Sequence, residues 1–180
     1  QKPIQRLFDY AGNFKYLTIA SWILAVISAF AALVPFYFIW CLIKEVLRVA
    51  PDYGVAQNLS FYGWSAVGTA VLAMLIYIGA LICSHLSAFR VQANMRSQLM
   101  RHILSLPLGF MEEEGSGKIR KIVNESSAAT ETYIAHQLPD KCVASATPAG
   151  LAILLLIFDW RLGLLCLIPV VAAFAVMSTM

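Results

Sequence analysis

Two long apolar runs that contain no charged residue limit what this chain can fold into. The first extends from about Tyr16 to Ile43, and the second from Phe61 to Phe89. A helix through the first run would be about 42 Å long, and the hydrocarbon core of a membrane is about 30 Å thick. Both runs are therefore predicted to span a membrane, and the chain is predicted to be an integral, multi-pass membrane protein.

Composition excludes the other broad classes of protein. Of the 180 residues, 60% are hydrophobic and 13% are charged, whereas soluble domains carry about 25% charged residues. Disordered chains are poor in apolar residues, so disorder is excluded as well. The net charge of +3 is too small to indicate a nucleic-acid partner. The cysteines are too far apart for a metal or redox motif, so no metal site is predicted from Cys41, Cys83, Cys142 or Cys166.

The second apolar run continues into an amphipathic segment. Between Arg90 and Leu106, apolar residues recur every four positions, at Val91, Met95, Leu99 and Ile103. No proline or glycine separates this segment from the second run, and Pro107 follows it. We therefore expect one helix over about 61–106, roughly 69 Å long, of which more than about 30 Å projects into water.

The rest of the chain is predicted to form two more membrane helices. Gly115 and Gly117 mark a turn, and helix-compatible residues follow. Asp159–Arg161 is the only break before a fourth apolar run, so the last two helices are expected to be adjacent and antiparallel. That run is still apolar where the sequence stops, so we expect a longer protein. The predicted fold is all-α, with helices at about 16–43, 61–106, 122–158 and 162–180.

Lysine and arginine are distributed unevenly between the two predicted sides of the membrane. Ten of the 13 belong to the N-terminal segment and to the 90–141 region, and three belong to the predicted loops Lys44–Ser60 and Asp159–Arg161. Positive residues are enriched on the cytoplasmic side of membrane proteins. The N-terminus and the 90–141 region are therefore predicted to be cytoplasmic, and the two loops external.

No catalytic constellation is recognisable. Gly117 and Lys118 lack the rest of a phosphate-binding loop, because Glu112 and Ile119 replace the required glycine and hydroxyl residue. Glu112–Glu114 is interpreted as a solvated acidic turn. His85 lies near the cytoplasmic end of the second run, and two interpretations stay open: contact with a transported substrate or proton, or a histidine at the membrane interface.

Two motifs carry a resemblance to a known family. The segment LPLGFMEEEGSGKI, at Leu106–Ile119, resembles the first intracellular loop of ABC exporter-type transmembrane domains, with matches at Leu106, Pro107, Phe110 and Gly117. The segment FDWRLGLLCL, at Phe158–Leu167, resembles the external turn between the third and fourth helices of that family, with matches at Trp160, Arg161 and Leu162. The whole chain is thus similar to the first four of six membrane helices.

The resemblance implies an exporter-type helical bundle and a coupling segment. A short helix near Gly117–Asn124 would lie across the cytoplasmic tip and dock on an ATP-binding domain, with a docking face made of apolar Ile119, Ile122 and Val123 flanked by basic residues. The family has an Asn-Asp pair after its loop glycine, and Asn124-Glu125 lies one position closer to Gly117. The implied coupling residues are Gly117, Lys118, Ile119, Arg120, Lys121, Ile122, Val123, Asn124 and Glu125.

The resemblance also implies partners and a function. ATP and Mg²⁺ would be bound by an ATP-binding domain that this chain does not contain. A second transmembrane domain, identical or different, and the lipid bilayer of the plasma or inner membrane would complete the assembly. The expected function is the membrane part of an ATP-driven ABC transporter, with a secondary carrier or channel segment as the alternative. Uncharged apolar runs favour an amphiphilic cargo over a small ion, and the direction of transport stays open.

Overall fold

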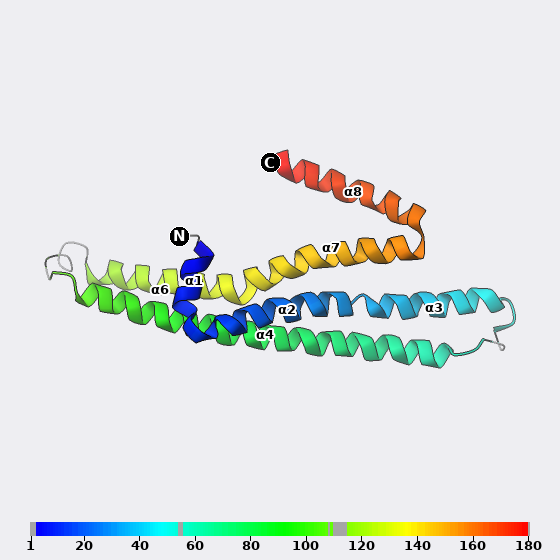
Figure 1. The fold of residues 1–180 in the computed structure, drawn as a ribbon, viewed down its shortest axis with the longest axis horizontal. Coiled ribbons are helices and arrows are strands. Elements are labelled where there is room, and N and C mark those ends of the chain that lie inside the picture. The colour runs from blue at the N-terminus through cyan, green and yellow to red at the C-terminus, as the bar shows by residue number, and fades with distance from the viewer. Residues whose placement is uncertain (1–2, 54–55, 108, 110–114, 180) are drawn as a thin grey trace. The chain divides into compact units, whose positions relative to one another are not determined.

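The computed structural model describes residues 3–53, 56–107, 109 and 115–179, and every regular element within them is a helix (Figure 1). The predicted all-α fold is confirmed. The chain divides into two compact units. The first comprises Gln1–Ala25 and Tyr77–Cys142, and the second comprises Val26–Ile76 and Val143–Met180.

The longest element is α4, a single helix over Leu59–Leu104 with 46 residues. It passes through Phe89 and Arg90 without a break, as the absence of a helix-breaking residue predicts. After Leu104 the chain tightens, because the amides of Ser105 and Leu106 donate to the carbonyls of His102 and Ile103. Pro107 then ends the helical path.

The first apolar run forms two helices where one is expected. After α1 (Pro3–Ala11) and a 3₁₀ turn (Gly12–Phe14), α2 covers Lys15–Ala31 and α3 covers Val34–Val49. The break lies immediately before Pro35, which has no amide hydrogen and whose ring clashes with the carbonyl one turn earlier. The amides of Leu33 and Phe36 instead donate to carbonyls three residues back, at 3.1 Å each.

The predicted loop over Lys44–Ser60 is wrong for its first residues, because α3 continues to Val49. Local contacts explain the extra helix. The ammonium of Lys44 lies 4.9 Å from the centre of the Trp40 ring, and Arg48 forms an ion pair of 2.7 Å with Glu45. These pairs are three and four residues apart, the spacing that brings side chains together on a helix.

The third helical stretch begins earlier than the expected residue 122. Helix α6 covers Ser116–Thr132, a π-helical turn covers Tyr133–Gln137, and α7 covers Leu138–Phe158. In the π turn, the amide of Leu138 donates to the carbonyl of Tyr133, five residues back. Such turns are rare and are frequent at functional sites.

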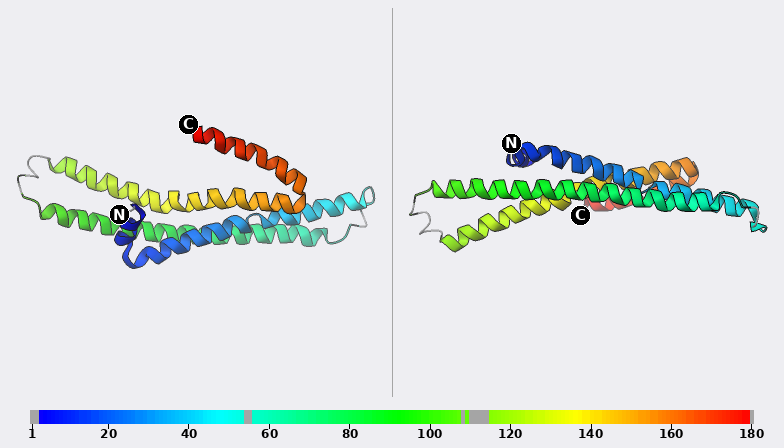
Figure 2. Two further views of the ribbon diagram at one scale, coloured as in Figure 1. Left: turned by 45° about the horizontal axis from the view of Figure 1, so that its top comes forward. Right: turned by 90° about the horizontal axis from the view of Figure 1, so that it is seen from below.

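The last helix, α8, covers Trp160–Thr179, so the expected three-residue break is reduced to Asp159. A carboxylate oxygen of Asp159 accepts a hydrogen bond of 2.9 Å from the amide of Arg161, which satisfies one of the free donors at the helix start. Figure 1 and the left view of Figure 2 show α8 running back from the end of α7 while diverging from it.

Three helical stretches are long and apolar enough to cross a membrane: Leu7–Val49, Leu59–Leu104 and Ser116–Phe158. A shorter apolar stretch lies at Gly163–Ala172. Many large apolar side chains on these helices are exposed, including Trp64 at 77% and Ile157 at 74%. Water would not tolerate so large an apolar surface, so the chain is an integral membrane protein.

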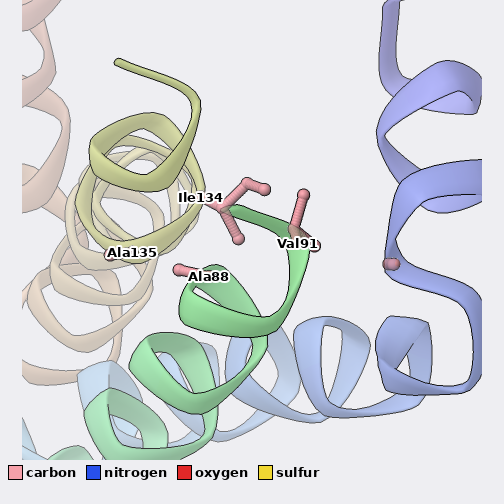
Figure 3. Packing of buried hydrophobic residues seen from close by; sticks show 5 residues of the cluster. Ala88, Val91, Ile134 and Ala135 are labelled. Atoms are coloured by element: carbon pink, nitrogen blue, oxygen red, sulfur yellow. The ribbon is translucent and has the colours of Figure 1, made fainter. Parts of the chain in front are cut away.

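The core of the first unit is made of three alanines and two larger aliphatic residues. Ala11, Ala88, Val91, Ile134 and Ala135 are buried together, each at most 2% exposed. Figure 3 shows Ile134 of the π turn beside Val91 and Ala88 of α4. Small side chains let helix backbones approach closely, which strengthens packing where lipid removes the hydrophobic driving force.

Candidate functional site

The residues of the expected coupling segment, Gly117–Glu125, lie in the first half of α6. The expectation of a separate short helix is wrong for these residues, because α6 continues without interruption to Thr132. The expectation that Gly117 makes the turn is wrong as well. Gly115 precedes the helix with a φ of +77°, a conformation that favours glycine, whereas Gly117 lies inside the helix.

The apolar residues of this segment face two different directions. Ile119 and Val123 are 9% and 8% exposed, and Ser127, one turn later, is also buried. Ile122 is 54% exposed. Of the expected docking face, Ile119 and Val123 therefore pack within this chain, and Ile122 is exposed.

The buried side of α6 faces the C-terminal end of α4, and both helices belong to the first unit. A groove of about 530 Å³ lies between them. Its apolar lining comes from Met100, Ile103 and Leu104 of α4 and from Ile119 and Val123 of α6, and the polar side chains that also line it are those of Arg96, Ser116, Arg120 and Asn124. The apolar part of this lining accounts for the burial of Ile119 and Val123.

The outward side of the segment is charged. Lys118, Arg120, Lys121 and Glu125 are all exposed. The ammonium of Lys121 lies 3.8 Å from a carboxylate oxygen of Glu125, one helical turn away. An exposed pair of this kind adds at most about 1 kcal/mol to stability. The surface left for a partner therefore combines Ile122 with basic residues and Glu125.

The comparison with protein families identifies the family to which the chain belongs. Residues 14–180 match the ABC transporter transmembrane region. The chain belongs to this family. Membership identifies it as the membrane-spanning part of an ABC transporter, and it decides against the secondary carrier or channel alternative.

The relatives of this ABC transporter region are much longer proteins. The mycobactin import ATP-binding/permease protein IrtA of Mycobacterium tuberculosis is 28% identical over 162 residues, which are 90% of this chain and 18% of that protein. Its counterpart in Mycolicibacterium smegmatis is 26% identical over 166 residues, which are 92% and 19%. The serine protease/ABC transporter B family protein tagA of Dictyostelium discoideum is 26% identical over 135 residues, which are 67% and 8%. The chain spans less than a fifth of the length of these curated relatives.

The two motifs of the ABC transporter resemblance differ in how much of them the structure describes. Phe110, Met111 and the acidic residues Glu112–Glu114 lie outside the described residues. In the second motif, the guanidinium of Arg161 lies 5.5 Å from the centre of the Trp160 ring at the start of α8. Trp160 is 61% exposed, as is common for tryptophan at a membrane interface.

His85, the candidate pathway residue of this ABC transporter region, lies against a second histidine. The rings of His85 on α4 and His136 in the π turn meet edge to face, with 4.9 Å between their centres. His85 is partly buried, His136 is exposed, and the ring centre of Phe89 lies 5.9 Å from that of His85. Among the described residues, no cluster of three or more His, Cys, Asp or Glu side chains could hold a metal ion.

Sequence reasoning missed the buried hydroxyl groups of the first unit. The hydroxyl of Ser84 is fully buried and donates to the carbonyl of Ala135 at 2.7 Å, with that of Ile134 at 3.1 Å. Ser87 forms a hydrogen bond with Thr18 of α2. A signal was present, since small residues recur one helical turn apart, at Ser84, Ser87, Ala88 and Val91.

Proposed function

We propose that this chain forms part of the substrate pathway of an ATP-driven transporter, and that the start of α6 transmits the work of ATP hydrolysis to it. The observation that carries the proposal is the family match over residues 14–180, joined with relatives named as ATP-binding/permease proteins. The length of α4 supports it, because 46 residues of helix extend about 69 Å and exceed a membrane core by about 39 Å.

The partners follow from this proposal. An ATP-binding domain, which would hold ATP and Mg²⁺, contacts the cytoplasmic end of α6, and a second transmembrane domain completes the pathway. We further propose the plasma or inner membrane as the location, with the N-terminus cytoplasmic, because ten of the 13 basic residues then lie inside. Cysteine labelling tests this orientation: a cysteine at Gln57 should react from outside and one at Ser116 from inside.

The proposed contact surface is narrower than the full segment Gly117–Glu125. Ile122 is its exposed apolar residue, and Lys118 and Lys121 supply positive charge near it, whereas Arg120 lines the groove toward α4. Such a surface suits a shallow apolar pocket with a negative rim on the ATP-binding domain. Asn124 and Glu125 lie at the end of this surface nearest the rest of α6.

A substitution at Ile122 in the full-length protein tests the coupling role. Ile122→Asp places a carboxylate in the proposed contact, where burial without a partner is costly. We expect normal membrane insertion, a loss of transport of at least about tenfold, and a loss of ATPase stimulation by cargo. Ala129→Asp is the matched control, because Ala129 is exposed on the same face of α6 two turns later. Normal coupled transport by Ile122→Asp would contradict the proposal.

We propose that the cargo is amphiphilic, because the apolar runs over 16–43 and 61–89 contain no charged side chain that would hold a small ion. Mycobactin is the first compound to test, because it is named in the function of two of the relatives. His85 is the residue proposed to contact cargo or its protons, and its partner ring on His136 belongs to the same site. A His85→Gln variant should raise the KM for transport while leaving the basal ATPase rate unchanged.

A further inference from the structure

The second unit contains a cavity that the coupling function does not use. It lies where α2 ends and α3 begins, against α7, and its volume is about 370 Å³. This volume is within the range of sites that hold small molecules, about 300–1,000 Å³. Its lining includes Phe30, Leu33, Tyr37, Gly150, Leu154 and Phe158.

Two backbone features form one end of this cavity. Pro35 separates α2 from α3 and leaves a short non-helical step at Ala32 and Leu33. Gly150 of α7 lies against this step so closely that a Cβ atom there would be 2.7 Å from a methyl carbon of Leu33 and 2.9 Å from the ring of Phe30. The absence of a side chain at Gly150 therefore permits the approach that closes this end.

The side chains that line the cavity favour a hydrocarbon ligand. Among the side chains that line the cavity, the hydroxyl of Tyr37 is the single polar group. A polar or ionic molecule would lose its hydration there without gaining hydrogen bonds in return. A hydrocarbon chain has no hydrogen bonds with water to lose, and it fills space that would otherwise lack van der Waals contacts.

A cation lies beyond the other end of the cavity. Phe158 of the lining stacks on Trp40, with 4.8 Å between ring centres and 11° between ring planes. The ammonium of Lys44 lies over the far part of this aromatic cluster, 4.9 Å from the centre of the Trp40 ring. Lys44 forms no ion pair with the described residues, and the neighbouring Glu45 is paired with Arg48. The order along the unit is thus apolar cavity, aromatic rings and positive charge.

We propose that this cavity binds one acyl chain of an anionic membrane phospholipid whose phosphate lies at Lys44. The sequence of apolar, aromatic and cationic groups matches the order of groups along such a lipid, with the rings at the depth where tryptophan and tyrosine lie in bilayers. The lysine supplies the preference for an anionic head group. The site belongs to the bilayer lipid and is separate from cargo and from the contact at Ile122.

The test uses the full-length protein in nanodiscs that contain a phosphatidylglycerol with a photoreactive group on one acyl chain. After illumination, mass spectrometry locates the labelled peptides. We expect label on the lining residues of α3 and α7, and about fivefold less when phosphatidylcholine with the same chains replaces the anionic lipid. Lys44→Gln should lower the labelling by phosphatidylglycerol to the level of phosphatidylcholine.

Two substitutions in α7 distinguish binding in the cavity from labelling elsewhere on the helix. Leu154→Phe fills the cavity and should abolish the label there, whereas Leu151→Phe adds the same volume at an exposed position outside the lining and should not. Equal labelling by both head groups, or undiminished labelling of the Leu154→Phe protein, would overturn the proposal. Loss of the label when ATP and vanadate are added would also overturn it, because the cavity would then belong to the translocation pathway.

Discussion

The two units of this chain hold their helices together by different chemistry. In the first unit, buried hydroxyl groups join segments far apart in the sequence, because Ser84 bonds to the π turn and Ser87 to Thr18. The exposed amide of Asn94 adds a hydrogen bond of 3.0 Å to the carbonyl of Tyr10. The second unit also buries small residues, at Ser28, Ala29 and Ala73, but it adds large aromatic side chains, such as the stacked rings of Trp40 and Phe158, and a cavity beside them.

The difference indicates which of the two units is less able to accommodate a larger side chain. Backbones that touch through alanine and serine leave no space for a larger side chain, and their hydrogen bonds have one geometry. Long aliphatic and aromatic side chains can repack, and the cavity already supplies free volume. The packing of the first unit therefore fits the proposed transmission of force from the start of α6, and the cavity of the second unit fits the proposed hydrophobic ligand.

The largest expected effect comes from enlarging a side chain in each unit. Ala88→Leu introduces three carbon atoms where the residue is fully buried, and should destabilise the first unit by about 1–3 kcal/mol or prevent folding. Leu154→Phe, beside the cavity, should cost less than about 1 kcal/mol. The apparent melting temperature of the detergent-solubilised full-length protein measures both changes. Similar losses from the two variants would remove the distinction between the units.

A smaller effect is expected when a single hydroxyl group is removed. Ser84→Ala deletes the donor to the carbonyls of Ile134 and Ala135, and should cost about 1 kcal/mol. Hydrogen exchange of the amides in the π turn should accelerate. Thr69→Ala is the control in the second unit, because the Thr69 hydroxyl bonds to the carbonyl of Ser65 in its own helix. Unchanged exchange at Tyr133–Gln137 in the Ser84→Ala protein would show that the hydroxyl does not hold the turn.

The smallest effect on stability is expected at the exposed face of α6. Glu125→Gln breaks the ion pair with Lys121, and should change stability by less than about 0.5 kcal/mol because water and salt screen both side chains. Transport measured on the same protein separates two roles for this residue. A fall in transport at unchanged melting temperature assigns Glu125 to the contact with the ATP-binding domain, whereas a large fall in melting temperature contradicts the weak pair described here.

The continuous helix α4 is the element that local sequence predicts best. Helix α4 continues past Phe89 because no residue there disfavours helix, and apolar surface along it requires lipid or another helix. The break before Pro35 was also readable from the sequence in principle, because a proline disrupts the preceding turn wherever it occurs.

The face on which a residue lies, and the residue it meets, were decided by the tertiary structure. Ile119 and Ile122 have the same side chain, yet one is buried against α4 and the other is exposed, because packing selects one face of a helix whose sequence is apolar on two. His85 and His136 are 51 positions apart, and only the fold brings their rings together. The sequence by itself determined that the chain forms long helices and that these helices lie in a membrane, because these properties depend on residues that are close together along the chain. Contacts between distant segments depend on how the helices pack.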